Sequence, residues 1–292
     1  MRDFRLAAVP LQSLVNDIEG NLSRIEQAVA TAVRGSADLV LLPELCLTGY
    51  ATDGSLQPLT VDGPEVKKLI RIADEHGVTV CAGIAETADG RIYDTQLVVE
   101  EGGLAGSYRK THLGEREQQT FSRGDCLTPI QSRLGILGFG ICWECRFPEI
   151  AGVLALQGAD VLLYPTASGL TAARRQEVWE RILPARAADN TCYVAAANSC
   201  GSNGSGVTFG GGAVAYGPHG ELLAADYRGQ GIVCDVSAAE LSRLRQHDHL
   251  SMRDVCYLDR RQPDLYRRLT ERHRLPLAAQ HPSDMLKLTV AG

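Results

Sequence analysis

A chain of 292 residues is long enough to bury one large hydrophobic core or two small ones. Its 45% hydrophobic and 22% charged residues are typical of a globular protein, and its net charge of −6 argues against nucleic acid or an anionic membrane as partner. The N-terminus is charged where a signal peptide is apolar, and no apolar run reaches about 18 residues, so a cytoplasmic protein without a spanning helix is expected.

The first half of the chain predicts strands that alternate with helices. Asn21 precedes apolar residues at helical spacing, which predicts a helix that it caps. Pro64 predicts the start of a second helix and Gly77 its end. Strands are predicted over residues 6–11, 37–42, 78–86, 92–100 and 104–109, the last three separated by glycine-containing turns.

The second half continues the alternation. Helices are predicted over 148–157, through Trp179 towards Asp189, and over 237–245; Pro184 should kink the middle one or begin a new turn. Strands are predicted over 134–141, 160–164, 192–198, 213–216, 221–225 and 231–236. Because two hairpins interrupt the βα alternation, the sheets should be mixed.

The chain has no evident linker, repeat or low-complexity run, which predicts one domain over residues 1–292. From about residue 250 the sequence is rich in arginine and proline and has little periodicity. We expect 250–292 to be a C-terminal tail on the surface or against a partner subunit.

One of the nine cysteines differs from the rest. An odd number scattered over a long chain does not fit a disulfide framework, and cysteines in apolar runs, such as Cys81, Cys192 and Cys234, are expected to be inert core residues. Cys142 instead ends a strand just before a helix. Backbone N–H groups and the positive end of a dipole would favour its thiolate there.

Two other reactive side chains also follow apolar strands directly. Glu44 follows the strand at 37–42, and Lys110 follows the strand at 104–109. Lysine is rare here, with four among 29 basic residues. Ligand chemistry in α/β folds gathers at the carboxyl ends of strands. A cysteine nucleophile, a carboxylate that moves protons and an ammonium that stabilises an oxyanion form a sensible catalytic set.

Each of these residues also has a simpler interpretation. Glu44 could be a solvated loop carboxylate and Lys110 a surface lysine, but an arginine could not fill the same small oxyanion pocket. Cys142 and Cys145 form a C-x-x-C motif of the redox type, although the rest of the chain does not suggest a thioredoxin-like fold. Zinc is disfavoured without a second cysteine pair or a histidine cluster. His112 is expected to be structural.

The motifs together resemble the nitrilase superfamily of carbon–nitrogen hydrolases. They are L-L-P-E-L-C-L-T-G-Y around Glu44, Y-R-K-T-H-L around Lys110 and G-F-G-I-C-W-E-C-R-F-P-E around Cys142. The likeness continues through Y-P-T-A-S and A-A-A-N-S to about residue 236. Within the third motif, Arg146-Phe147-Pro148-Glu149 is similar to the amidase-like branch.

The resemblance implies an α/β fold, an αββα four-layer sandwich with two mixed β-sheets, and a Glu–Lys–Cys triad. Glu44 would be the general base, Lys110 would bind the oxyanion, and Cys142 would form a thioester. The backbone N–H of Trp143 would be a second oxyanion donor. Glu117, four residues before Phe121 and preferred to Glu115 for that reason, would orient the amide and the attacking water. Tyr50, Thr166 and Ala167 would line the pocket.

The sequence therefore predicts a cysteine-dependent hydrolase of small linear amides or carbamoyl compounds, with no metal or organic cofactor. Glu144 stands where amidases often have Asp, and the Cys-Trp-Glu order leaves a nitrilase as an alternative. Acyl transfer to an amine, a silent binding protein and a redox protein are further alternatives. A small-molecule substrate and a homodimer or higher homo-oligomer are the expected partners.

Overall fold

The computed structural model describes residues 1–246, 256 and 258–271. The chain divides into a large unit, Met1–Leu258, and a C-terminal unit, Asp259–Gly292. Short 3-10 turns occupy Leu258–Arg260 and Pro263–Thr270. Most of the predicted tail lies outside the described residues, so its packing stays a prediction.

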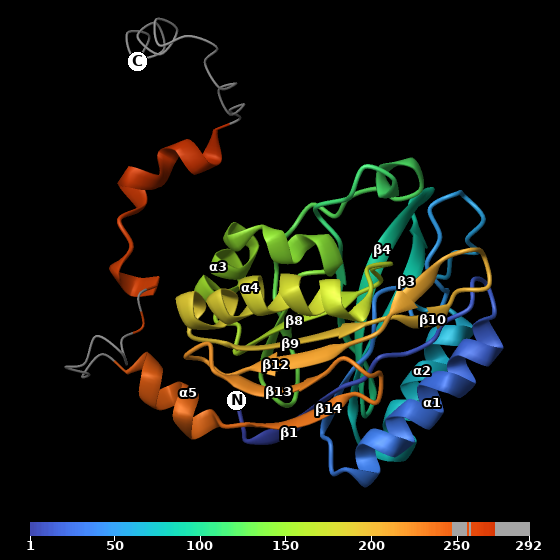
Figure 1. Ribbon diagram of the computed structural model, residues 1–292, viewed down its shortest axis with the longest axis horizontal. Coiled ribbons are helices and arrows are strands. Elements are labelled where there is room, and N and C mark those ends of the chain that lie inside the picture. Colours follow the sequence, from blue (N-terminus) through green and yellow to red (C-terminus); the bar gives the residue numbers. More distant parts are fainter. Residues whose placement is uncertain (247–255, 257, 272–292) are drawn as a thin grey trace, which may run out of the picture. The chain divides into compact units, whose positions relative to one another are not determined.

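Two six-stranded mixed sheets form the centre of the large unit (Figure 1). The first sheet has the order β14-β1-β2-β3-β4-β5, with strands Ile232–Val236, Phe4–Ala8, Leu39–Leu41, Thr79–Ala88, Arg91–Glu100 and Gly103–Arg109. The second has the order β13-β12-β9-β8-β7-β6, with strands Leu222–Asp226, Ala213–Tyr216, Tyr193–Asn198, Val161–Thr166, Ile136–Phe139 and Ile130–Gln131. The pairs β1–β2, β2–β3, β7–β8 and β8–β9 are parallel and the other pairs are antiparallel.

Alternating side chains explain why the sheets stack. Leu39 and Leu41 of β2 face the core between the two sheets, whereas Val40 packs under helices α1 (Ile18–Arg34) and α2 (Pro64–His76). In the same way Leu163 of β8 faces the other sheet, and Leu162 packs under α3 (Pro148–Leu156) and α4 (Ala172–Asn190). The predicted αββα four-layer sandwich is confirmed (Figure 1).

Most predicted helix ends agree with the structure, but the predicted cap of the first helix is wrong. Pro64 begins α2, and Gly77 ends it in the left-handed conformation. Asp17, not Asn21, caps α1; Asn21 lies inside the helix, where its buried amide donates to the carbonyls of Leu14 and Leu47. Pro184 lies inside α4, which continues through it to Asn190, so no new helix begins there.

Three short strands were not predicted, namely β6 and the hairpin strands β10 (Cys200–Ser202) and β11 (Thr208–Gly210). Ser237 caps helix α5 (Ala238–Arg245). Among the described residues, no helix combines the length and apolar character needed to cross a membrane.

Candidate active site

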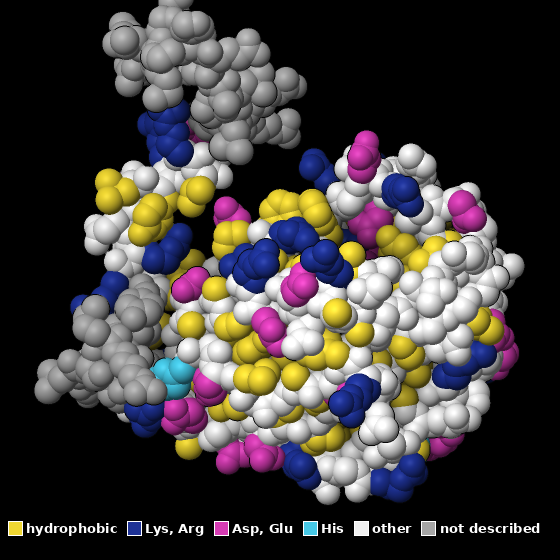
Figure 2. Space-filling view, in the orientation of Figure 1, with side chains coloured by type: hydrophobic (Ala, Val, Ile, Leu, Met, Phe, Trp, Pro, Cys, Tyr) yellow, Lys and Arg dark blue, Asp and Glu magenta, His cyan; other side chains and the backbone are white. Residues whose placement is uncertain are grey.

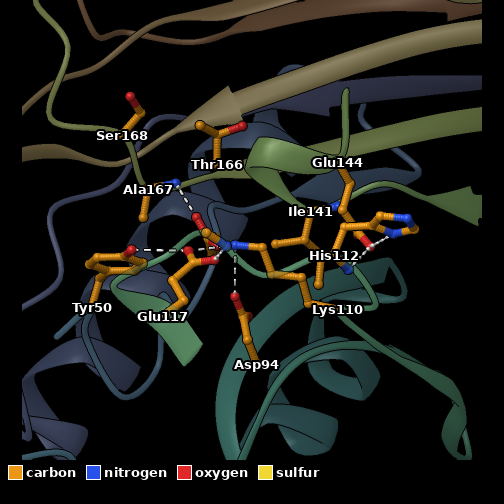
Figure 3. A network of polar contacts seen from close by, with 12 residues as sticks. Tyr50, Asp94, Lys110, His112, Glu117, Ile141, Glu144, Thr166, Ala167 and Ser168 are labelled. Atoms are coloured by element: carbon orange, nitrogen blue, oxygen red, sulfur yellow. Dashed lines mark hydrogen bonds and ion pairs between the residues drawn. The ribbon is translucent and has the colours of Figure 1, made fainter. Parts of the chain in front are cut away.

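The ammonium of Lys110 is the centre of a buried polar network (Figure 3). Its Nζ lies 2.5 Å from Glu44 Oε1, 2.7 Å from Glu117 Oε1 and 3.4 Å from Asp94 Oδ2. Burial alone would lower the pKa of Lys110, but the nearby carboxylates of Glu44 and Asp94, with Glu117, raise that pKa well above its usual range. Lys110 therefore carries a positive charge in the interior.

Glu44 is positioned by three segments around it. It follows β2 after Pro43, and Gly83 of β3 allows this approach, because a Cβ at Gly83 would overlap the backbone of Leu45. The second carboxylate oxygen of Glu44 accepts a hydrogen bond from the backbone N–H of Ala167 at 2.6 Å. Ala167 and Ser168 follow β8, and Asn198 fixes this segment, because its side-chain oxygen accepts a hydrogen bond from Ser168 N–H at 2.9 Å.

Glu117 is the glutamate that reaches Lys110, whereas Glu115 is exposed. A 3-10 turn, Glu117–Gln119, places its side chain inward. One oxygen accepts from Lys110 and from the Tyr50 hydroxyl at 3.0 Å (Figure 3). The other accepts from Gly114 N–H at 2.7 Å. Tyr50 thus belongs to the network through Glu117.

Cys142 begins a 3-10 turn, Cys142–Arg146, just beyond β7. Its φ of +50° lies in the left-handed region, where a side chain other than glycine is strained. Gly140 brings this turn close to β8, because a Cβ there would lie 2.6 Å from the Tyr164 ring. Trp143 is the second residue of the turn, a position whose N–H has no partner inside the turn.

The predicted preference of Cys142 for the thiolate is wrong. Burial, and next the charge of Glu44, raise the pKa of the Cys142 thiol well above its usual range, and Lys110 and Arg175 only partly oppose them. These interactions also show that the sulfur lies within electrostatic range of Glu44 and Lys110. The Cys142 side chain is therefore a neutral thiol at rest, and a base would have to remove its proton before the sulfur could attack a substrate.

Glu144 is a second buried carboxylate; its hydrogen bonds come from backbone N–H groups and hydroxyls, and the Nδ1 of His112 lies 3.7 Å from its Oε1. Its Oε1 accepts from the Tyr108 hydroxyl, from the backbone N–H and hydroxyl of Thr111 and from His112 N–H, at 2.6–3.1 Å. Its Oε2 accepts from Ile141 N–H at 2.7 Å. Glu144 therefore ties the residues that follow Lys110 to the residue that precedes Cys142.

Two further residues predicted to line the pocket, Trp143 and Thr166, differ in how far they are exposed to solvent. The Trp143 side chain is 43% exposed and packs edge-on against Phe147. With His112 and Phe121, these two rings line a cavity of about 480 Å³ whose lining does not include Cys142. Thr166 is buried, and its hydroxyl donates to Tyr164 of its own strand, so no hydrogen bond joins its side chain to the network.

Asp94 is a member of the network that sequence reasoning missed. It lies within β4, and burial, followed by the Glu44 charge, raises its pKa well above the usual range. With Glu44 and Glu117 it forms a group whose spacing could suit a metal ion, but Lys110 Nζ already contacts all three carboxylates. Lys110 is thus the counter-ion of this cluster.

The C-x-x-C motif holds two free thiols. Cys145 is buried in the cluster under α3 and α4 and makes no hydrogen bond with Lys110, Glu44 or Glu117. Cys81 and Cys192 are fully buried and Cys234 nearly so, as predicted.

The chain is similar to known proteins over most of its length. The family model for carbon-nitrogen hydrolases matches residues 5–246, and the chain belongs to that family. The chain is 32% identical over 280 residues to the chloroplastic omega-amidase of Arabidopsis thaliana, covering 85% of this chain and 74% of the relative. It is 30% identical to a probable nitrilase of Schizosaccharomyces pombe, covering 90% and 97%.

Among solved structures, a mutant amidase from Nesterenkonia sp. AN1 is 26% identical, with a TM-score of 0.75 and coverage of 91% of this chain and 96% of that one. In that protein the acetamide moiety of fluoroacetamide is covalently added at the active-site cysteine. The resemblance to the nitrilase superfamily is confirmed.

Proposed function

We propose that this carbon–nitrogen hydrolase cleaves small linear amides or carbamoyl compounds through a thioester on Cys142. The observation that carries the proposal is the buried Lys110 ammonium, held between Glu44 and Glu117 and close to the Cys142 thiol. The omega-amidase relative and the modified cysteine of the Nesterenkonia amidase support the same reaction class.

In the first half of the reaction, the sulfur of Cys142 attacks the amide carbonyl carbon. Glu44 takes the thiol proton as the C–S bond forms, because the raised pKa of Cys142 keeps the thiol neutral until then. The carbonyl oxygen becomes an oxyanion, which the Lys110 ammonium and the Trp143 N–H stabilise. The C–N bond then breaks, and Glu44 passes the proton to the departing ammonia or amine.

In the second half, water replaces the leaving group. Glu44 takes a proton from that water, the resulting hydroxyl attacks the thioester carbon, and the C–S bond breaks. The proton returns to the sulfur and the acid leaves. Glu117, fixed by Tyr50 and Gly114, orients the amide nitrogen and later the water.

The test is ammonia release from a panel of short aliphatic amides by wild type and by two matched cysteine variants. Cys142→Ala should lose activity by at least about 10⁴-fold, since it removes the nucleophile. Cys145→Ala, three residues away and buried outside the network, should keep activity within a few-fold. Ammonia release by Cys142→Ala at the wild-type rate would sink the proposal.

A nitrilase is the second candidate, supported by the Schizosaccharomyces pombe relative and by the Cys-Trp-Glu order. Glu144 does not favour it, because both carboxylate oxygens are already occupied by donors of the protein. Assays of amides and nitriles with the same carbon skeleton separate the two, and a clear preference for the nitrile would reverse our choice.

A homo-oligomer is also proposed, on the family resemblance alone. Size-exclusion chromatography with light scattering measures it, and a monomeric mass would reject it.

A further inference from the structure

Asp94 differs from the other two carboxylates of the Lys110 cluster in its hydrogen bonds. Acidic side chains that reach the surface, magenta in Figure 2, are solvated there, whereas Asp94 is 1% exposed. Neither of its carboxylate oxygens accepts a hydrogen bond from an N–H or O–H group of the residues that the structure describes. Lys110 Nζ lies 3.4 Å from its Oδ2 but donates its hydrogen bonds to Glu44 and Glu117.

The other two carboxylates of the cluster have donors on both oxygens. Glu44 accepts from Lys110 Nζ and from one backbone N–H, at 2.5 and 2.6 Å. Glu117 accepts from Lys110 Nζ, from one hydroxyl and from one backbone N–H, at 2.7–3.0 Å. Hydrogen bonds of this kind stabilise the charged form of a carboxylate. Glu44 and Glu117 are therefore held as anions, and Asp94 is not.

Strand pairing fixes Asp94 in this position. Ala85 of β3 is its partner on one side, and on the other side the backbone N–H of Lys110 donates to the Asp94 carbonyl at 2.8 Å. The titratable groups around its side chain are Glu44, Lys110 and Glu117, and the same cluster acts on Tyr50 and Cys142. The carboxyl group of Asp94 thus meets two anions and one cation away from water.

A proton on Asp94 lowers the cost of this arrangement. Glu44, Asp94 and Glu117 each place an oxygen within 4.8 Å of the others, and one ammonium balances one of the three charges. Carboxyl groups so close together in a buried site do not all ionise. Burial and then the charge of Glu44 raise the pKa of Asp94 well above its usual range, and a hydrogen bond between these two side chains adds to the rise. Two carboxyl groups can share a hydrogen bond only when one of them carries the proton.

We propose that Asp94 is a neutral carboxylic acid in the folded enzyme and that its O–H donates to Glu44, which makes it a positioning residue for the base. The role of Glu44 as base rests on the proposed function, whereas the protonation of Asp94 is measured without turnover. The hydrogen bond favours an ionised Glu44 that can take the thiol proton. With Asp94 neutral, two anions and not three compete with the oxyanion for the Lys110 ammonium.

The first experiment compares urea unfolding of wild type and Asp94→Asn between about pH 5 and pH 7. Asparagine has the shape of the neutral acid and cannot ionise. Folded wild type holds a proton that the unfolded chain loses above about pH 4, so a rise in pH favours its unfolding. The unfolding equilibrium constant of wild type, divided by that of Asp94→Asn, should therefore rise about tenfold per pH unit. A ratio that does not change with pH means an ionised Asp94 and overturns the inference.

Glu86→Gln is the matched control on the neighbouring strand β3. Glu86 is 3% exposed, and although burial alone would raise its pKa, hydrogen bonds from Arg109 and Thr95 lower it. Glu86 is therefore ionised in both the folded and the unfolded chain over this pH range, and the corresponding ratio should stay constant. A tenfold slope in this variant as well would show that removal of any buried carboxylate produces it, and would overturn the inference.

Infrared spectroscopy measures the proton without any need for refolding. The difference spectrum of wild type minus Asp94→Asn at neutral pH should contain the carbonyl stretch of one neutral carboxylic acid, which shifts on transfer into D₂O. A difference spectrum with only the bands of an ionised carboxylate overturns the inference.

The pH profile of kcat/KM tests the positioning role, because its acid limb reports protonation of the base in the free enzyme. Asp94→Asn retains a donor to Glu44 and should keep the wild-type position of that limb. Asp94→Val removes the donor and should move the limb to higher pH by about one unit, as expected for the loss of one hydrogen bond to a charged group. A limb that stays in place in Asp94→Val overturns the positioning role. If wild type turned over no amide, the proposed function would fail, and the unfolding and infrared results would still decide the protonation of Asp94.

Discussion

Two buried carboxylate networks lie on either side of the Lys110 segment, and they are built differently. In the first, Glu44, Asp94 and Glu117 share one ammonium, and a thiol lies within range of their charges. In the second, Glu144 is surrounded by N–H and O–H donors from Tyr108, Thr111, His112 and Ile141. Three carboxylates that share one ammonium keep negative charge with which to accept a proton. A carboxylate whose oxygens all accept hydrogen bonds from N–H and O–H groups instead holds two chain segments together. The first network is suited to chemistry and the second to support.

Among changes within the two carboxylate networks, those at Lys110 should have the largest effect. Lys110→Arg keeps the charge but not the compact ammonium, so kcat should fall by about 10²–10³-fold, the cost of losing one oxyanion donor. Lys110→Met leaves the three carboxylates without a counter-ion and should also lower the free energy of unfolding by about 3–5 kcal/mol. Steady-state ammonia release measures kcat, and urea unfolding measures the free energy of unfolding. Full activity in Lys110→Arg would refute the oxyanion role.

Glu144→Gln should affect folding more than chemistry. The change places an NH₂ group against donors such as Ile141 N–H, which should lower the free energy of unfolding by about 3 kcal/mol. The exposed Glu115→Gln is the control and should change stability by less than about 0.5 kcal/mol. If Glu144→Gln were as stable as wild type but inactive, Glu144 would belong to the chemical network instead.

The pH dependence of alkylation tests the state of the nucleophile. Because the pKa of Cys142 is raised, its thiolate fraction at pH 8 should be below that of a free cysteine and should still be rising at pH 10. Iodoacetamide labelling of the Cys142 peptide, followed by mass spectrometry between pH 6 and pH 10, measures this. A rate that levels off near neutral pH would indicate a thiolate at rest.

The smallest effects should come from removing one tyrosine hydroxyl from each network. Tyr50→Phe removes the donor to Glu117 and should lower kcat/KM about fivefold, equivalent to about 1 kcal/mol, with little change in melting temperature. Tyr108→Phe removes the donor to Glu144 and should lower the free energy of unfolding by about 1–2 kcal/mol with a smaller loss of activity. If Tyr50→Phe mainly lowered stability and Tyr108→Phe mainly lowered activity, the roles assigned to the two networks would be wrong.

The sequence predicted those members of the site that directly follow strands. Glu44, Lys110 and Cys142 were found because strand ends are visible as breaks in apolar runs, and Glu117 was selected by its spacing to Phe121. The sheet order could not be derived in this way, because it depends on which strands pair across long separations. The state of the thiol was mispredicted, since local N–H groups are visible in sequence whereas burial beside Glu44 is not.

The residues missed by sequence reasoning had weaker signals. Asp94 is a carboxylate inside a strand. Its side chain is buried because β4 pairs with β3 on one side and β5 on the other, and the sequence does not reveal that pairing. Arg175 follows another arginine and looks solvent-exposed, but its spacing of four to Trp179 and of eight to Leu183 places it on the buried face of α4. That spacing was the available signal.

The central claim is a thioester on Cys142, and partitioning with hydroxylamine tests it most directly. An amide and an ester that share one acyl group pass through the same acyl-enzyme, so hydroxylamine should divide both into hydroxamate and acid in the same ratio. Our account predicts equal ratios for the two substrates and no hydroxamate with Cys142→Ala. Ratios that depend on the leaving group, or acid formed from the amide without any hydroxamate, would contradict it.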